Sequence, residues 1–130
     1  MSAGAIDNTV LSNFAHVQQP SLLEQALDNL VSVPAVMEEL AIGQERGLIP
    51  TVEWCWLSVI ELTTSEKMLS QEIGQTLGRG EAECIAVAQS QTLFILSDDR
   101  DARRIAQRRS LVVTGTLTRL SKACSKRLGC

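Results

Sequence analysis

The sequence predicts one α/β domain built on a mostly parallel sheet, with helices packed on both faces of that sheet. Short apolar segments of strand type alternate with longer segments of helical periodicity, which is typical of βα units. The run Leu93–Leu96 is continuously apolar, as expected for a strand buried on both faces. A length of 130 residues without a Pro/Gly/Ser-rich linker suits a single core. Residues 1–130 are therefore interpreted as one domain.

The first half of the chain contains clear helix signals. Pro20 suits a first helical turn, and leucines and alanines follow it at helical spacing as far as Leu30. Pro34 begins a second helix, which Gly47 stops. The elements expected in this half are a strand at 3–6, a turn at Asn8 and Thr9 leading into the apolar segment 10–14, a helix at 20–30, a strand at 31–33 and a helix at 34–46.

In the second half, β-branched and aromatic residues dominate positions 52–62, so we expect an extended segment there. Trp54 and Trp56 alternate within it and are expected to pack in the core or at an interface. Thr64 or Ser65 should cap the next helix, which the glycines at 78 and 80 end. The remaining expected elements are helices at 64–77 and 80–89, a strand at 93–96, a helix at 101–109, a strand at 111–113 and a last helix after residue 116.

The basic side chains are concentrated near the C-terminus. Residues 1–99 carry 14 acidic and 3 basic side chains, whereas residues 100–130 carry 1 acidic and 9 basic ones. A basic segment beside an acidic centre suits a polyanionic substrate. A solvated helix face is an equally good interpretation of the same charges.

The sequence gives no signal for membrane insertion or secretion. It has no run of about 18 apolar residues, and its first residues lack the basic start and long apolar stretch of a signal peptide. We therefore expect a cytoplasmic protein without a transmembrane helix. The cysteines 55, 84, 124 and 130 form no CxxC pair, so reduced thiols are expected, with Cys55 and Cys84 in the core.

Acidic residues occur where the α/β pattern would bring them to one edge of the sheet. Asp7 follows the first strand, and Asp98 and Asp99 follow the strand at 93–96. Carboxylates that converge repel each other unless a cation joins them, and hard oxygen ligands favour Mg²⁺ or Mn²⁺. Most of the acids also have an ordinary alternative role. Glu39 could be a solvated helix residue, and Glu81 and Glu83 could stabilise a helix N-terminus. Asp98 or Asp99 could cap the helix that follows.

The acidic segments resemble, in order, the motifs of PIN-domain ribonucleases. These segments are Ile6–Leu11, Val36–Leu40, Gly80–Ala86 and Leu96–Asp101. The stretch 77–116 is especially similar to a PIN-like branch related to VapC-type toxins, and the resemblance covers residues 3–117. It implies a three-layer α/β/α fold with a mostly parallel central sheet.

Carried over position by position, the resemblance assigns roles to thirteen residues. The implied catalytic and metal-binding carboxylates are Asp7, Glu39, Glu83 and Asp99, with Glu81, Asp98 and Asp101 as alternates. The hydroxyls of Thr9 and Ser97 would orient a carboxylate or a bound water. The guanidinium groups of Arg79, Arg100, Arg103 and Arg104 would hold substrate phosphates.

The implied activity is hydrolysis of RNA phosphodiester bonds with Mg²⁺ or Mn²⁺, by an endoribonuclease that serves as the toxin of a toxin–antitoxin pair and forms a homodimer. The alternative is a PIN-fold binding or regulatory module that has lost catalysis. Three departures from the motifs bear on this choice: Gly4 in the first strand, Asn8 beside the first acid, and a tail at 118–130 that looks truncated or altered.

Overall fold

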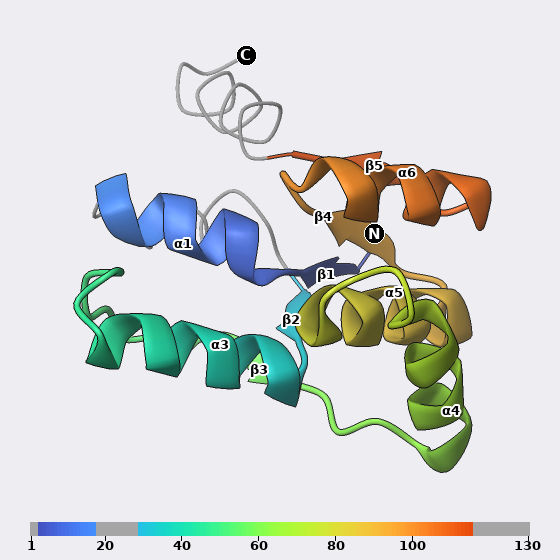
Figure 1. Cartoon of the computed structure of the whole chain (residues 1–130), viewed down its shortest axis with the longest axis horizontal. Coiled ribbons are helices and arrows are strands. Elements are labelled where there is room, and N and C mark those ends of the chain that lie inside the picture. Colours follow the sequence, from blue (N-terminus) through green and yellow to red (C-terminus); the bar gives the residue numbers. More distant parts are fainter. Residues whose placement is uncertain (1–2, 18–28, 116–130) are drawn as a thin grey trace.

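The computed structural model describes residues 3–17 and 29–115 of the chain. Within these residues, five parallel strands form one sheet in the order β3-β2-β1-β4-β5. The strands are β1 (Gly4–Ile6), β2 (Leu30–Ser32), β3 (Ser58–Val59), β4 (Phe94–Leu96) and β5 (Val113–Thr114). The helices are α1 (Asn8–Val17), α3 (Pro34–Glu45), α4 (Thr64–Ile73), α5 (Arg79–Gln91) and α6 (Arg100–Arg108). The α/β/α fold expected from the sequence is confirmed (Figure 1).

Strand β1 lies at the centre of the sheet, between β2 and β4. All three of its residues are buried. Gly4 is the register partner of Phe94, and a Cβ atom on Gly4 would lie only 2.3 Å from Cζ of the Phe94 ring. The sequence analysis noted Gly4 as a departure from the motif. In the structure, the lack of a side chain at Gly4 is what lets β1 pack against the ring of Phe94.

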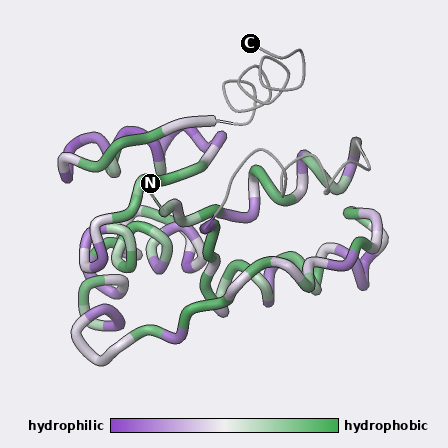
Figure 2. The backbone as a smooth tube through the Cα atoms, turned by 180° about the vertical axis from the view of Figure 1, so that it is seen from behind, coloured by the Kyte–Doolittle hydropathy of each residue, from purple (hydrophilic) through white to green (hydrophobic). Residues whose placement is uncertain are grey.

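Helix α5 joins the layers of the molecule. It contacts helices α3, α4 and α6 as well as strands β1 and β4. Most of its middle is buried, including Ala82, Ile85, Ala86 and Ala88, and these mostly small side chains allow close packing. Figure 2 shows hydrophobic colour along the central strands and strongly hydrophilic stretches in α6. Burial thus fixes α5 against the sheet, and with it the positions of its glutamates.

Helix α1 occupies a segment for which the sequence analysis expected only a turn and an apolar stretch. The helix starts at Asn8, directly after Asp7, and runs to Val17. Its buried residues are Val10, Leu11, Phe14 and Ala15, which is the spacing of one helical face. The helix expected at 20–30 falls mostly on residues 18–28, outside the described residues, and Leu30 at its end belongs to β2 instead.

The extended segment expected at 52–62 is mostly wrong. Only Ser58 and Val59 form a strand, β3, at the edge of the sheet. The chain turns just before it, where the backbone N–H of Leu57 donates to the carbonyl of Trp54 at 3.0 Å. Trp54 is buried and meets the ring of Trp56 edge-on, at 6.1 Å between centroids, so Trp54 packs in the core as expected.

The two cysteines expected in the core differ in burial. Cys55 is exposed, contrary to expectation, whereas Cys84 is buried.

Several helix and strand boundaries also differ from expectation. Thr63, rather than Thr64 or Ser65, caps α4: its hydroxyl accepts from the backbone N–H of Glu66 at 3.2 Å. The N–H of Thr63 donates in return to the Glu66 carboxylate at 2.8 Å, and this bond lowers the pKa of Glu66. Helix α4 ends at Ile73 and strand β5 covers 113–114. The last expected helix lies outside the described residues, and no helix in the described part is long and apolar enough to span a membrane.

Candidate metal centre

The strand order creates a switch point between β1 and β4. From β1 the chain proceeds to β2 and β3 on one side, and later to β4 and β5 on the other. Ile6 and Leu96 are register partners at the carboxyl ends of these neighbouring parallel strands. Ligands of open α/β sheets bind beyond such ends, at the switch point. Asp7 and Ser97 are the first residues past them, so the fold places both side chains at this position.

Asp7 is the most enclosed acid of the site, with only 2% of its surface exposed. One carboxylate oxygen accepts from the hydroxyl of Thr9 at 2.5 Å and from the backbone N–H groups of Thr9 and Val10 at 3.1 and 3.4 Å. The other accepts from the hydroxyl of Ser97 at 2.5 Å. The start of α1 and the end of β4 together hold this carboxylate in one orientation.

The two hydroxyl groups around Asp7 also connect it to the acids that follow β4. Thr9 Oγ1 accepts from the backbone N–H of Asp98 at 3.0 Å, and Ser97 Oγ accepts from that of Asp99 at 3.1 Å. Asp99 caps α6, since its carboxylate accepts from the N–H of Ala102 at 2.8 Å. The ends of β1 and β4 are thus joined by side chains as well as by backbone pairing.

Glu39 and Glu81 approach this edge from two helices. Glu39, on α3, accepts from the backbone N–H of Gly80 at the start of α5, at 3.0 Å. A Cβ atom on Gly80 would lie 2.8 Å from that same Glu39 oxygen, so only glycine permits this contact. Glu81 follows in the first turn of α5 and is half-buried.

Glu83 points toward a different neighbour. Its carboxylate accepts from the backbone N–H of Ala35, near the start of α3, at 3.3 Å. The other oxygen lies 3.4 Å from Nε of Arg79. Glu83 is therefore held between α3 and Arg79, whereas Glu81 is the α5 acid that interacts with the acids following β1 and β4.

The electrostatics of the site identify a group of like charges. Burial raises the pKa of Asp7 above its usual value, against the opposing effect of its hydrogen bonds. Burial, followed by the charges of Asp99 and Asp7 and then of Glu39, raises the pKa of Glu81 to about 7. Asp7, Glu39 and Asp99 are thus close enough to Glu81 to act on its charge. We call these four residues the acidic cluster.

Comparisons with known proteins identify the family of the chain. Residues 5–128 match the family described as a PIN domain (DUF3368). The chain belongs to the PIN-domain family. Members of this family are generally nucleases, and PIN domains typically use divalent metals. No match was found among the curated proteins.

Two solved structures share the fold of this PIN domain. PAE2754 from Pyrobaculum aerophilum superposes with a TM-score of 0.64 at 17% identity, over 95% of this chain and 90% of that one. SSO1118, a PilT N-terminus domain protein from Sulfolobus solfataricus P2, superposes with a TM-score of 0.65 at 16% identity, over 92% of each chain.

The donor atoms of the acidic cluster are of the chemical type that Mg²⁺ or Mn²⁺ binds. All are carboxylate oxygens, which hard divalent cations prefer. The nearby thiol of Cys84 is kept neutral, because burial and the surrounding carboxylates raise its pKa well above normal. Among the described residues, no three acidic, His or Cys side chains are grouped closely enough to hold a metal ion, and Glu39 and Asp99 each accept from a backbone N–H.

The remaining residues predicted for the site lie around its rim. Arg79 pairs with Glu38 at 3.1 Å, and Arg103 donates to the carbonyl of Ser97 at 3.0 Å. Asp101 pairs with Arg104 at 2.9 Å on the exposed face of α6. Arg100 is exposed at the start of that helix. Asp101 therefore lies in a surface ion pair rather than beside Asp7.

Sequence reasoning missed one polar residue of the edge. The side-chain amide of Asn13 donates to the carboxylate of Asp98 at 2.7 Å. Asn13 is four residues beyond Thr9 and therefore on the same side of α1. Recognising the helical spacing of residues 10–15 would have placed Asn13 at this edge.

Proposed function

We propose that this PIN domain is a divalent-metal-dependent endoribonuclease, with RNA phosphodiester bonds as its substrate. The observation that carries the proposal is the acidic cluster at the switch point, where Asp7 is buried and the charges of Asp99, Asp7 and Glu39 raise the pKa of Glu81. A cluster of this kind costs folding free energy unless it serves a cation. The family's general nuclease activity supports the same conclusion.

The proposed roles follow from the contacts. Asp7, Glu39, Asp99 and one of the two α5 glutamates, Glu81 or Glu83, would hold Mg²⁺ or Mn²⁺. A cation bound there would supply Lewis-acid stabilisation of phosphate charge and an activated water.

Thr9 and Ser97 orient Asp7 by donating to its two oxygens. Asn13 fixes Asp98 in a similar way. These residues would act on the site by positioning its acids.

The test is cleavage of a pool of structured and single-stranded RNA by the full chain with Mn²⁺. Wild type is compared with Asp7→Asn and Glu39→Gln, and Glu45→Gln is the matched control because Glu45 is an exposed residue farther along α3. We expect metal-dependent cleavage that both site variants lose and the control retains. Equal cleavage by all four proteins, or cleavage that chelation does not stop, would contradict the proposal.

The second candidate is a binding module without catalysis, and one observation favours it. Glu39 and Asp99 both accept hydrogen bonds from backbone N–H groups at helix starts, so each already has a structural role that does not depend on catalysis. Folded protein that binds RNA but neither binds Mn²⁺ nor cleaves RNA would support this candidate.

An antitoxin partner and a homodimer are further proposals that come from the resemblance to VapC-type toxins. Trp54 is buried within the chain, so it is a poor candidate for the dimer interface. The exposed apolar residues Ile42 and Leu48, at the end of α3 and just beyond it, are better candidates. Light scattering of the purified chain should give the mass of two copies, and Leu48→Glu should reduce it to one.

A further inference from the structure

We propose that the exposed arginines of α6 form a track for RNA phosphates, which holds a strand along the helix without reading its bases. The arginine track is defined as Arg100, Arg104 and Arg108. The inference rests on the proposed ribonuclease function and extends it from the scissile bond to the rest of the substrate.

The three arginines lie in a row on one face of α6. They are spaced by four residues, which places them on the same side of a helix, with a rise of ~6 Å from each to the next. All three are exposed. Because Asp99 is the N-cap of α6, the first arginine of the row directly adjoins the acidic cluster, and the row leads away from it.

Two surface hollows lie along the track and share the side chain of Arg104. The first, of about 530 Å³, is lined by Asp98, Arg100 and Arg103 together with Arg104. The second, of about 640 Å³, is lined by Arg104 and Arg108 and by residues of α4 such as Glu72. Asp101 also borders the second hollow, but its exposed pair with Arg104 is of the weak surface kind. Basic side chains outnumber acidic ones in both hollows.

Among the helices that the structure describes, the charge pattern singles out α6. Residues 1–99 carry 14 acidic and 3 basic side chains, whereas α6 carries four arginines in nine residues. A polyanion would be attracted to the arginines of α6 and repelled by the acidic side chains of the other described helices. Guanidinium groups match phosphate oxygens in geometry as well as in charge.

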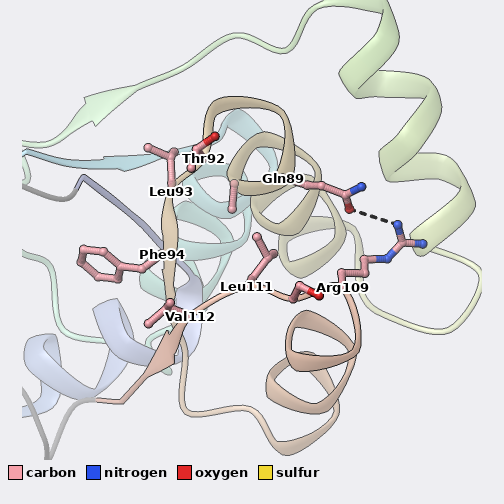
Figure 3. Close-up of a pocket in the computed structure, with 9 residues that line it drawn as sticks. Gln89, Thr92, Leu93, Phe94, Arg109, Leu111 and Val112 are labelled. Atoms are coloured by element: carbon pink, nitrogen blue, oxygen red, sulfur yellow. Dashed lines mark hydrogen bonds between the residues drawn. The ribbon is translucent and has the colours of Figure 1, made fainter.

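Three other arginines are left out of the track because they lie outside its row of every fourth residue, and each is also bonded within the protein. Arg79 pairs with Glu38 and Glu83. Arg103 donates to the Ser97 carbonyl. Arg109 donates to Gln89 at 3.1 Å beside a separate pocket, at the amino ends of β4 and β5 (Figure 3).

The hollows lack the groups that would read bases. The chain has two Phe, two Trp and no Tyr, and none of these lines either hollow. Single-strand binders with aromatic platforms stack bases on them, whereas contacts to phosphates alone carry no direct sequence information. The track is therefore expected to bind RNA strands of different sequence equally.

The test measures binding of a short fluorescein-labelled oligouridine to the full chain in EDTA, over a series of salt concentrations. Each phosphate contact contributes ~0.7 to the slope of log K against log salt for a single strand. The variant with Arg100, Arg104 and Arg108 all changed to Ala should lose about 2 from that slope. Replacing the same three residues by Lys should retain most of it, and Arg46→Ala, an exposed change at the C-cap of α3, should leave it unchanged. Thermal melts confirm that each variant is folded.

An unchanged slope in the folded triple-Ala variant would overturn the inference. So would a clear preference of the wild type for oligouridine over oligocytidine, or a track that binds an acidic protein segment but not RNA. Because EDTA prevents metal-dependent cleavage, the outcome is independent of catalysis. Binding through the track by a protein that never cleaves RNA would refute the proposed function alone, whereas cleavage with an unchanged slope would refute the track alone.

Discussion

Asp7 combines two properties that usually exclude each other: it is buried and it is acidic. It remains compatible with the fold because the hydroxyls of Thr9 and Ser97 both donate to its carboxylate. Burial nevertheless raises its pKa. Burial thus makes the charged form of Asp7 costly, which is the situation expected of an acid at a functional site.

At the residue scale, Ser97→Ala tests how the first acid is held. The Ser97 hydroxyl donates to one Asp7 oxygen and accepts from the backbone N–H of Asp99. The change removes both hydrogen bonds. The expected loss is ~1–3 kcal/mol of unfolding free energy. Urea denaturation measures it, with Ser58→Ala on the exposed edge strand as control. A loss no larger than that of the control would show that the hydroxyl does not support Asp7.

Glu81 gives a pH-dependent prediction whose sign is fixed. Its pKa in the folded protein is raised from 4.5 to about 7, so its contribution to stability is present at low pH and is lost as pH rises through about 7. Glu81→Gln does not titrate and should therefore gain melting temperature relative to wild type between pH 5 and pH 8. A difference in melting temperature that stays constant across this range would contradict the shift.

At the scale of elements, the start of α5 is built around Gly80, which leaves room for Glu39. Gly80→Ala should displace the Glu39 carboxylate, whose end is flexible, at little cost to the fold. Alanine also favours helix over glycine, so the melting temperature should be unchanged or higher while Mn²⁺-dependent cleavage falls at least tenfold. Full cleavage by a folded Gly80→Ala protein would remove Glu39 from the site.

The elements differ in how well the sequence predicts them. The apolar run of β4 and the glycines at the start of α5 are strong local signals. From them, the sequence correctly predicts that Asp98 and Asp99 follow a strand and that Glu81 and Glu83 lie on a helix. Helix α1 was missed because a short apolar run does not distinguish helix from strand. The segment before β3 has β-branched and aromatic residues, but tertiary packing of Trp54 in a turn overrides their preference.

The direction of each carboxylate could not be predicted from the sequence. Glu81 and Glu83 are two residues apart, and the neighbours of each carboxylate depend on backbone N–H groups of other elements. Ala35, at the start of α3, engages Glu83, and Gly80 engages Glu39. Such contacts exist only after α3 and α5 have packed together.

At the scale of the whole molecule, the fold places an acidic group of residues and a basic row of residues next to each other. The acidic cluster lies at the switch point between β1 and β4, and the arginine track leads away from it along α6. Figure 1 shows α6 beside the end of the sheet formed by β4 and β5. A cation at the edge would offset the repulsion that an RNA strand meets there. On the two proposals made above, the acidic cluster and the arginines of α6 would bind one RNA strand together.

The most direct test of the account is calorimetric titration of the full chain with Mn²⁺, comparing wild type with Asp7→Asn. The account predicts saturable Mn²⁺ binding by wild type that weakens at least tenfold in Asp7→Asn, although the variant remains folded. The affinity should also rise with pH through about 7, as Glu81 ionises. Absence of binding, or equal binding by the two proteins, would contradict the assignment of this edge as a metal centre.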